Sequence, residues 1–331
     1  MFSGKTILIT GGTGSLGRAL TRRLLKEDVA AIRIFSRGEW AQIQMERLFN
    51  DRRLRFFIGD VRDRDRLRRA VEGADVVFHA AALKQIPLIE YNAFEAVKTN
   101  VYGSQNVIDA CMDAEVEKVV GVSSDKACSP LNTYGATKLL MEKLFVTANF
   151  YKGKRKTVFS CVRYGNVFGS RGSIIPVWKK QLRNGFITIT DPVMTRFNIT
   201  MDEALKFILS TTDIAQGAEI FVPKLKSYVV GDLADECIEV SGRKIEKKCI
   251  GLRPGEKTHE SLLNKEEMNY TFEDSKFYIL MPASSLATQF GISNHYAKSR
   301  VKTVKNRDPY TSETAPKLSK KELRQLIEGH I

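Results

Sequence analysis

Hydrophobic and polar residues alternate in two different rhythms along the first half of this chain. Short apolar, β-branched runs occupy residues 5–10, 31–36, 55–60, 75–81, 119–124 and 157–163. Between them, apolar residues recur at three- and four-residue spacing, first at positions 16, 19, 20 and 24 and later at 97, 101, 107 and 110. The runs are typical of buried strands and the spacing is typical of amphipathic helices. Their alternation predicts an α/β fold: a doubly wound parallel sheet with helices on both faces and ligands at the carboxyl ends of its strands.

The pattern loosens after about residue 165. A glycine-rich segment at 169–172 leads to a predicted helix from Pro176, a strand at 187–190, a helix at 201–211 and a strand at 220–222. Residues 293–316 are polar and rich in Lys and Arg, which predicts a loop or disorder, and a short helix capped by Ser319 is expected at 318–328. We predict a nucleotide-binding domain at 1–165, a smaller, partly interleaved substrate lobe at 166–290, and a partly flexible C-terminal tail at 291–331.

Composition narrows the class of protein. The 331 residues are 43% hydrophobic and 27% charged, as in ordinary soluble proteins. No apolar run approaches the ~20 residues of a membrane span, and the first strand begins too early for a signal peptide. We therefore expect a cytoplasmic protein with no membrane partner. The five cysteines are dispersed and none of the four histidines stands at metal-ligand spacing, so no metal site is expected.

The formal net charge of +14 is the unusual bulk property. A strongly basic chain can bind nucleic acid, but here Lys and Arg are spread along predicted helix faces instead of forming one stripe interleaved with aromatic residues. The alternative is a solvated basic surface with an electropositive cleft for phosphorylated small molecules. We expect the alternative, and no nucleic-acid partner.

A glycine-rich turn joins the first predicted strand to the first helix. The pattern Gly12-x-Gly14-x-x-Gly17, preceded by Gly11, allows a tight turn and close approach of a pyrophosphate to the helix N-terminus. The flanking strand and helix make this a Rossmann-type dinucleotide fingerprint. The expected cofactor contacts here are Gly11, Thr13, Gly14, Ser15, Leu16 and Gly17.

The ends of the following strands indicate which dinucleotide binds. An NAD site places Asp or Glu at the end of the second strand, where it binds the ribose 2′-hydroxyl. This chain has Ser36 and Arg37 there, a hydroxyl and a cation suited to a 2′-phosphate, with Glu39 close by. We predict NADP. The further cofactor contacts expected are Asp60 and Val61 at the adenine and Ala80, Ala81 and Ala82 at the nicotinamide ribose.

Two groups of proton-handling residues stand close together in sequence. Tyr134 and Lys138 fall on one face at the start of a predicted helix, and Ser124, Asp125 and Lys126 end the preceding strand. A tyrosine of pKa ~10 needs roughly 4 kcal/mol of phenolate stabilisation to act near neutrality, which an ammonium and a nicotinamide cation can supply. Either group could instead be a chance pair on the surface. For Asp125 and Lys126 in particular, adjacent residues of a strand point to opposite sides unless the chain bends. Behind a nucleotide fold, they indicate an enzyme that oxidises its substrate, eliminates a group and returns the hydride.

These residues carry a family resemblance. The run at 10–17 and the Tyr134/Lys138 pair resemble the extended short-chain dehydrogenase/reductase superfamily. Over roughly residues 1–280 the chain resembles its inverting UDP-N-acetylglucosamine 4,6-dehydratases, which begin pathways to pseudaminic acid and related surface sugars. The strings that carry this are 36–37, 59–63, 79–84, 125–128, 163–167, 170–173, 194–197 and 253–257. Ser124, Gln85 and Gly38 depart from relatives, which often carry threonine, histidine and aspartate there.

The resemblance implies a catalytic role for each residue. Tyr134, assisted by Lys138, would take the C4 hydroxyl proton while the hydride moves to NADP, and Ser124 would keep the hydroxyl of the relatives' threonine. Lys126 would remove the C5 proton and Asp125 would protonate the departing C6 hydroxyl. Related dTDP-glucose dehydratases carry glutamate at the position of Lys126. Hydride return to C6 would leave an inverted 4-keto-6-deoxy sugar, with NADP retained for the next turnover.

Substrate binding is expected from charged and polar residues, because Arg forks suit the diphosphate of a UDP-sugar. The candidates are Lys84, Asn166, Arg196, Arg253 and Glu256. Three alternatives stay open: a UDP-sugar 4-epimerase, which needs no elimination pair; a dehydratase with added 5-epimerase activity; and a non-catalytic NADP-binding regulator. The resemblance also implies a homo-oligomer, a dimer or a hexamer.

Overall fold

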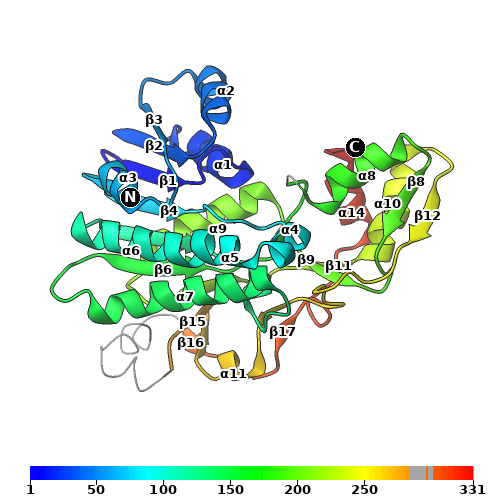
Figure 1. The fold of residues 1–331 in the computed structure, drawn as a ribbon. Helices are drawn as coiled ribbons and strands as arrows, with labels where there is room; N and C mark the ends of the chain where they lie inside the picture. Colours follow the sequence, from blue (N-terminus) through cyan, green and yellow to red (C-terminus); the bar gives the residue numbers. More distant parts are fainter. Residues whose placement is uncertain (171, 284–295, 297–300, 331) are drawn as a thin grey trace.

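A ten-stranded sheet runs through the computed structural model, which describes residues 1–170, 172–283, 296 and 301–330 (Figure 1). From one edge to the other its strands are β16 (Lys302–Thr303), β14 (Thr271–Glu273), β15 (Phe277–Leu280), β10 (Ile220–Pro223), β6 (Val158–Val162), β5 (Lys118–Val122), β4 (Val76–His79), β1 (Thr6–Thr10), β2 (Ala31–Ser36) and β3 (Leu54–Ile58). The strands from β10 to β3 are parallel, and β15, β14 and β16 extend the sheet with antiparallel pairs. The order 3-2-1-4-5-6 is that of a Rossmann-type sheet, so the predicted fold class is confirmed.

Helices cover both faces of this sheet, as the apolar spacing predicts. One face packs against α3 (Arg64–Val71), α6 (Gly103–Asp113) and α7 (Thr133–Tyr151), and the other against α1 (Ser15–Leu24), α2 (Glu39–Phe49) and α9 (Met201–Ile214). Alternate strand residues enter the two cores: Leu8 faces the first, and Ile7 and Ile9 face the second. The short helices α4 (Ile86–Tyr91) and α5 (Ala93–Ala96) and the π-helix η1 (Val97–Tyr102) lead into α6.

A smaller lobe with its own apolar core stands beside the sheet (Figure 1). Trp178, Leu233 and Ile327 are among the fully buried residues of this core. The elements of the lobe are β7 (Asn166–Val167), α8 (Ile174–Leu182), β8 (Phe186–Ile189), β9 (Thr195–Ile199), β11 (Ser227–Val229), α10 (Val230–Ser241), β12 (Glu246–Cys249) and α14 (Lys320–Glu328). The three-part division into 1–165, 166–290 and 291–331 stays a prediction. In the structure, segments of all three parts supply strands to the main sheet.

The prediction of loop or disorder for 293–316 is wrong in two places. Within the described part of that stretch, β16 pairs with β14, and β17 (Tyr310–Thr311) pairs with β13 (Ser261–Leu263). Strand β17 is anchored by Tyr310, whose ring packs on Phe197 and whose hydroxyl bonds the backbone of Leu225. The mainly polar composition of residues 293–316 gave no sign of this single aromatic contact. Residues 293–295 and 297–300 lie outside the described residues, whereas the expected helix at α14 is present and begins after a capping box at Ser319.

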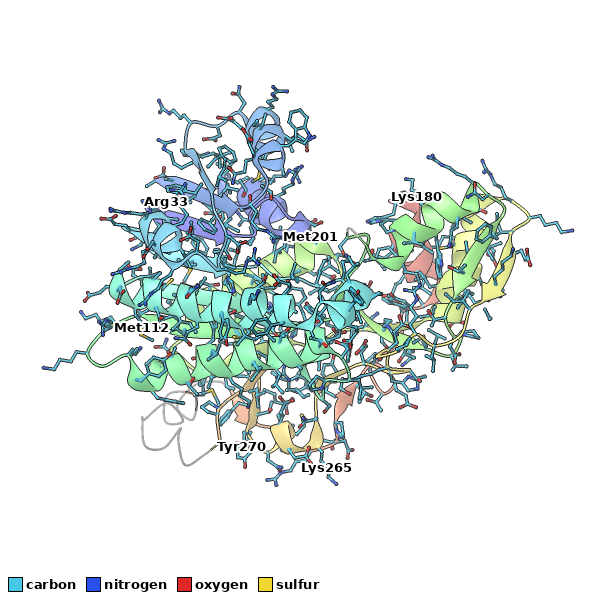
Figure 2. All side chains as sticks on the ribbon, in the orientation of Figure 1. Arg33, Met112, Lys180, Met201, Lys265 and Tyr270 are labelled. Atoms are coloured by element: carbon cyan, nitrogen blue, oxygen red, sulfur yellow. The ribbon has the colours of Figure 1, made fainter. Side chains whose placement is uncertain are left out.

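Cationic side chains project from widely separated elements, as Figure 2 shows for Arg33 on β2, Lys180 on α8 and Lys265 on α11 (Lys265–Met268). Helix α3 carries four more, interspersed with Asp65, so the basic residues are spread over several elements. In the part of the chain that the structure describes, no helix has the length and apolar character needed to cross a bilayer.

Candidate active site

A cavity of about 1010 Å³ opens where the chain order of the sheet reverses, between β1 and β4, and extends to the small lobe. This is where doubly wound sheets bind ligands. Every residue predicted to touch the cofactor lies on its wall: Gly11, Thr13, Gly14, Ser15, Leu16, Gly17, Ser36, Arg37, Asp60, Val61, Ala80, Ala81, Ala82, Tyr134 and Lys138. The structure therefore brings these residues together, while their contacts with a dinucleotide remain a prediction.

The glycines of the fingerprint stand where a side chain would clash with neighbouring backbone. Gly11 has a φ of +66°, and a Cβ there would lie 2.8 Å from the backbone nitrogen of Ala81. A Cβ on Gly17 would collide with the backbone of Gly12. Helix α1 can thus begin directly against β1, with its N-terminal N–H groups at the cavity, as a pyrophosphate requires.

At the adenosine end of this wall, an arginine faces an acidic residue. Arg37 is 58% exposed, and its guanidinium lies 3.9 Å from the carboxylate of Asp60. Arg62 also bonds that carboxylate, at 2.7 and 3.0 Å. Burial raises the pKa of Asp60, but the bonds from Arg62 and the charge of Arg37 lower it by more. With Arg62 neutralising Asp60, the Arg37 cation is left to attract a phosphate.

Helix α7 positions Tyr134 and Lys138 at the cavity. The helix begins at Asn132, whose side chain accepts a 2.8 Å bond from the backbone N–H of Gly135. Burial raises the pKa of Tyr134, against the charge of Lys126 and the hydroxyl of Ser124, which lower it. Burial also lowers the pKa of Lys138 to about 8. Tyr134 is therefore a phenol at rest, and a further positive charge is needed to make it a base.

The bend that the Asp125–Lys126 pair requires is present as a 3₁₀ turn, η2 (Asp125–Ala127). The turn brings neighbouring side chains together: Asp125 Oδ1 accepts bonds from Ser124 Oγ at 2.7 Å and from Lys126 Nζ at 3.1 Å. Gly135 packs so closely on the carbonyl of Lys126 that a Cβ would collide with it. Ser124 and Lys126 line the cavity, and Asp125 lies fully buried behind them.

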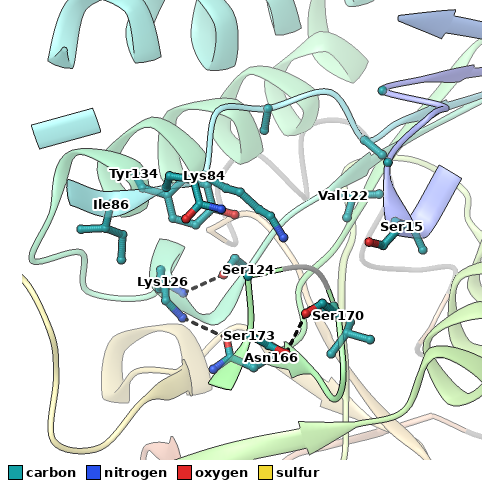
Figure 3. A pocket seen from close by; sticks show the side chains of 18 of the residues that line it. Ser15, Lys84, Ile86, Val122, Ser124, Lys126, Tyr134, Asn166, Ser170 and Ser173 are labelled. Atoms are coloured by element: carbon teal, nitrogen blue, oxygen red, sulfur yellow. Dashed lines mark hydrogen bonds between the residues drawn. The ribbon is translucent and has the colours of Figure 1, made fainter. Parts of the chain in front are cut away.

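Lys126 lies among three side-chain oxygen atoms, and Figure 3 shows its contact with one of them, on Asn166. Besides Asp125, its Nζ is 3.3 Å from Asn166 Oδ1 and 3.4 Å from Glu260 Oε1. Burial lowers the pKa of Lys126, but the carboxylates of Asp125 and Glu260 raise it by more, so the net pKa is raised. Sequence reasoning missed Glu260. It follows the 253–257 string, but no spacing rule connects it with position 126.

The predicted substrate residues also meet at this cavity. Lys84, Asn166, Arg196, Arg253 and Glu256 all line it. Arg196 is held by the carbonyls of Thr195 and Thr258 at 2.7 and 3.0 Å. The 253–256 loop is attached to the start of α7 by a 2.8 Å bond from Asn132 Nδ2 to the carbonyl of Gly255. Two arginines and a lysine on one wall can bind an anionic ligand beside the proton-handling groups.

Within the described ranges, His, Cys, Asp and Glu side chains form no group of three or more that could hold a metal ion. The cavity combines the wall that carries the predicted dinucleotide contacts, the partly exposed Tyr134 with the buried Lys138, and the Asp125/Lys126 pair.

Comparison with known proteins extends over the whole chain. Residues 7–282 match the model of a family described as polysaccharide biosynthesis protein. A protein of Methanocaldococcus jannaschii described as an uncharacterized membrane protein is 46% identical, over 98% of this chain and 96% of its own. An inverting UDP-N-acetylglucosamine 4,6-dehydratase of Campylobacter jejuni is 44% identical over 99% and 98%. A UDP-glucose 4-epimerase of Rickettsia prowazekii is 40% identical over 99% and 96%.

Solved structures agree with the fold. The X-ray structure of Pen from Bacillus thuringiensis has a TM-score of 0.91 and 40% identity, covering 100% of this chain and 98% of that one. A dTDP-glucose 4,6-dehydratase from Streptomyces venezuelae, solved with NAD, has a TM-score of 0.69 at 22% identity, covering 76% and 86%. At that identity the second likeness shows the fold alone.

Proposed function

This chain belongs to the polysaccharide biosynthesis protein family, and we propose that it is an NADP-dependent lyase that dehydrates UDP-N-acetylglucosamine with inversion at C5. The product would be UDP-2-acetamido-2,6-dideoxy-β-L-arabino-hex-4-ulose, a precursor of surface sugars of the pseudaminic acid type. One observation carries the proposal: Lys126 lines the cavity wall in contact with Asp125, close to Tyr134. The Campylobacter jejuni relative bears the name of this activity.

In the proposed reaction, Tyr134 takes the proton of the C4 hydroxyl, and Lys138 supplies positive charge at the same wall. A nicotinamide dinucleotide bound along the cavity supplies the hydride acceptor and later the hydride. Lys126 then removes the C5 proton, which a C4 ketone makes acidic. Asp125 provides the proton for the leaving C6 hydroxyl. Because Ser124 Oγ is bonded to Asp125 and lines the cavity, we place the proton path through that hydroxyl.

The Asp125–Lys126 ion pair already contains the acid and the base that elimination requires. Moving one proton across the 3.1 Å contact converts carboxylate and ammonium into carboxylic acid and amine. The number of bound protons stays the same, so no proton has to be exchanged with solvent before C5 is attacked. Each such acid or base role contributes about 10²–10⁴ in rate.

The test is incubation of the purified protein with UDP-N-acetylglucosamine, without added cofactor, followed by NMR of the products. We expect loss of water and inversion at C5, since the cofactor is regenerated in each turnover. A product changed only at C4 would instead indicate an epimerase, the activity named for the Rickettsia relatives. No reaction with any UDP-sugar would contradict both.

Arg37→Ala is expected to weaken NADP binding about 10- to 100-fold, because charge-assisted hydrogen bonds contribute about 1.5–3 kcal/mol each. Binding of NAD should change little, since its ribose offers no phosphate to the guanidinium. Titration of cofactor-free protein with both dinucleotides measures the effect. Arg47→Ala, on the α2 helix that follows Arg37 and stacked over Trp40, is the control. Equal affinities of the two dinucleotides for the wild type would rule out the NADP preference.

We also propose that the protein is a homo-oligomer. Large apolar side chains are exposed on the neighbouring elements α4, α5 and η1: Leu88, Tyr91, Phe94 and Tyr102. Tyr91 is 91% exposed. Neighbouring exposed apolar residues of this kind mark protein interfaces, and a second copy of the chain offers an equivalent surface for a symmetric contact.

A further inference from the structure

Glu260, just before β13, is a buried carboxylate that faces two cations. Its Oε1 lies 3.4 Å from Lys126 Nζ and 4.0 Å from Arg196 Nε, and the residue is only 3% exposed. Among the residues that the structure describes, no hydrogen-bond partner reaches Oε2. A buried carboxylate is costly unless cations and hydrogen bonds compensate it. Lys126 and Arg196 are therefore the groups that make an ionised Glu260 tolerable here.

The backbone of Glu260 is fixed from the side away from the cavity. Its N–H donates to Ser312 Oγ at 2.9 Å, and its carbonyl accepts from the N–H of Ser312 at 2.8 Å. Ser312 Oγ also donates to the carbonyl of Thr195 at 3.1 Å. The backbone that carries the carboxylate is thus anchored through Ser312 to β9 and to the 310–312 segment.

We propose that Glu260 is a positioning residue that holds the amine of Lys126 toward C5 during elimination; this rests on the proposed dehydration. Asp125 adjoins Lys126 in the same turn, so that contact alone leaves the long lysine side chain free to rotate. Glu260 and Asn166 add two oxygens from other elements, so that three acceptors match the three donors of the ammonium. After one proton has passed to Asp125, Glu260 and Asn166 accept hydrogen bonds from the remaining two N–H groups and keep the amine nitrogen at the cavity wall.

The charges around Lys126 predict how its titration depends on Glu260. The groups that face it are the carboxylates of Asp125 and Glu260, the guanidinium of Arg196 and the phenols of Tyr134 and Tyr228. Glu260 is one of the two anions that raise the pKa of Lys126. Its neutralisation removes an anion beside the Asp125–Lys126 pair, so the pair should take up an additional proton less readily and the acidic limb of the kcat profile should move to lower pH.

The experiment is Glu260→Gln in the full-length enzyme, with kcat and KM measured across pH. We expect the plateau kcat to fall at least about tenfold because the amine is no longer held, with the acidic limb about one unit lower. The first oxidation should persist, so dihydronicotinamide absorbance should accumulate while wash-in of solvent deuterium at C5 slows. Glu313→Gln, an exposed carboxylate beside Ser312, should match the wild type.

A second variant separates charge from position. Glu260→Asp keeps the anion and draws it back by one methylene, so it should keep the acidic limb near that of the wild type and lose plateau rate. This variant decides the question if Glu260→Gln does not fold. A wild-type plateau rate in Glu260→Asp, or wild-type rate and pH limb in Glu260→Gln, overturns the inference and leaves the proposed function standing. If the wild type releases no water from any UDP-sugar, the proposed function fails and this inference with it.

Discussion

Lys126→Met should lower the rate of water release by about 10²–10⁴ while the first hydride transfer continues. Methionine keeps the length and apolar stem of the side chain but cannot take a proton from C5. Tyr134 and Lys138, on a different element, remain able to oxidise C4. Mixing the variant with substrate should therefore give stable absorbance of the reduced nicotinamide without formation of the 4-keto-6-deoxy sugar. Stopped-flow absorbance and NMR of the quenched mixture measure the two steps separately.

The control for this variant is Lys143→Met, an exposed lysine on α7, which should leave both steps unchanged. The assignment of Lys126 as the base would be wrong if Lys126→Met formed the dehydrated product at the wild-type rate. Simultaneous loss of the absorbance change and of product would show that Lys126 acts in substrate binding instead.

Arg163→Met should cost about 3–5 kcal/mol in the free energy of unfolding, because it leaves two carboxylates without their cation. Arg163 is fully buried and bonds Glu142 on α7 at 2.7 and 2.9 Å and Glu267 on α11 at 2.8 and 2.9 Å. It also bonds the carbonyl of Leu262. This one guanidinium joins β6 to α7 and to the 262–267 segment. Urea unfolding followed by circular dichroism measures the loss.

The triple variant Arg163→Met, Glu142→Gln, Glu267→Gln should recover much of that stability, since it removes the uncompensated charge as well. An equal or larger loss in the triple variant would show that packing, not charge, dominates. The pH dependence has a definite sign. Burial raises the pKa of Glu267, but Arg163 lowers it by more, so the net folded value is depressed. Its stabilisation is present above the unfolded pKa of ~4.3 and is lost as pH falls through the folded value.

Local patterns predicted the parts of this molecule that local chemistry determines. The β-branched runs at 31–36 and 157–163 became β2 and β6 because a strand buried on both faces is apolar throughout. The fingerprint glycines and the Tyr134/Lys138 pair sit in turns and helix starts set by nearby residues. The carboxyl ends of parallel strands then bring such residues to one edge of the sheet.

The features that could not be predicted from the sequence depend on contacts between residues far apart in the chain. Glu260 meets Lys126, and Glu267 meets Arg163, only when the segment with β13 and α11 has packed beside η2 and the end of β6. The full burial of Asp125 likewise follows from the η2 turn and from what covers it, not from its neighbours in sequence. Strand β17 was not predicted for a different reason: its segment is mainly polar, and a single aromatic residue, Tyr310, anchors it.

The late position of Ser312 in the chain determines when the surroundings of Lys126 can form during synthesis. Domains generally form in the order in which the ribosome releases them, and β1 to β6 with their helices are complete by residue 162. A nascent chain of that length already contains the fingerprint and both proton-handling groups. It still lacks Glu260 and the 310–312 segment that anchors it. The segment that carries the predicted cofactor residues of β1 to β5 can thus form before the residues that surround Lys126 are in place.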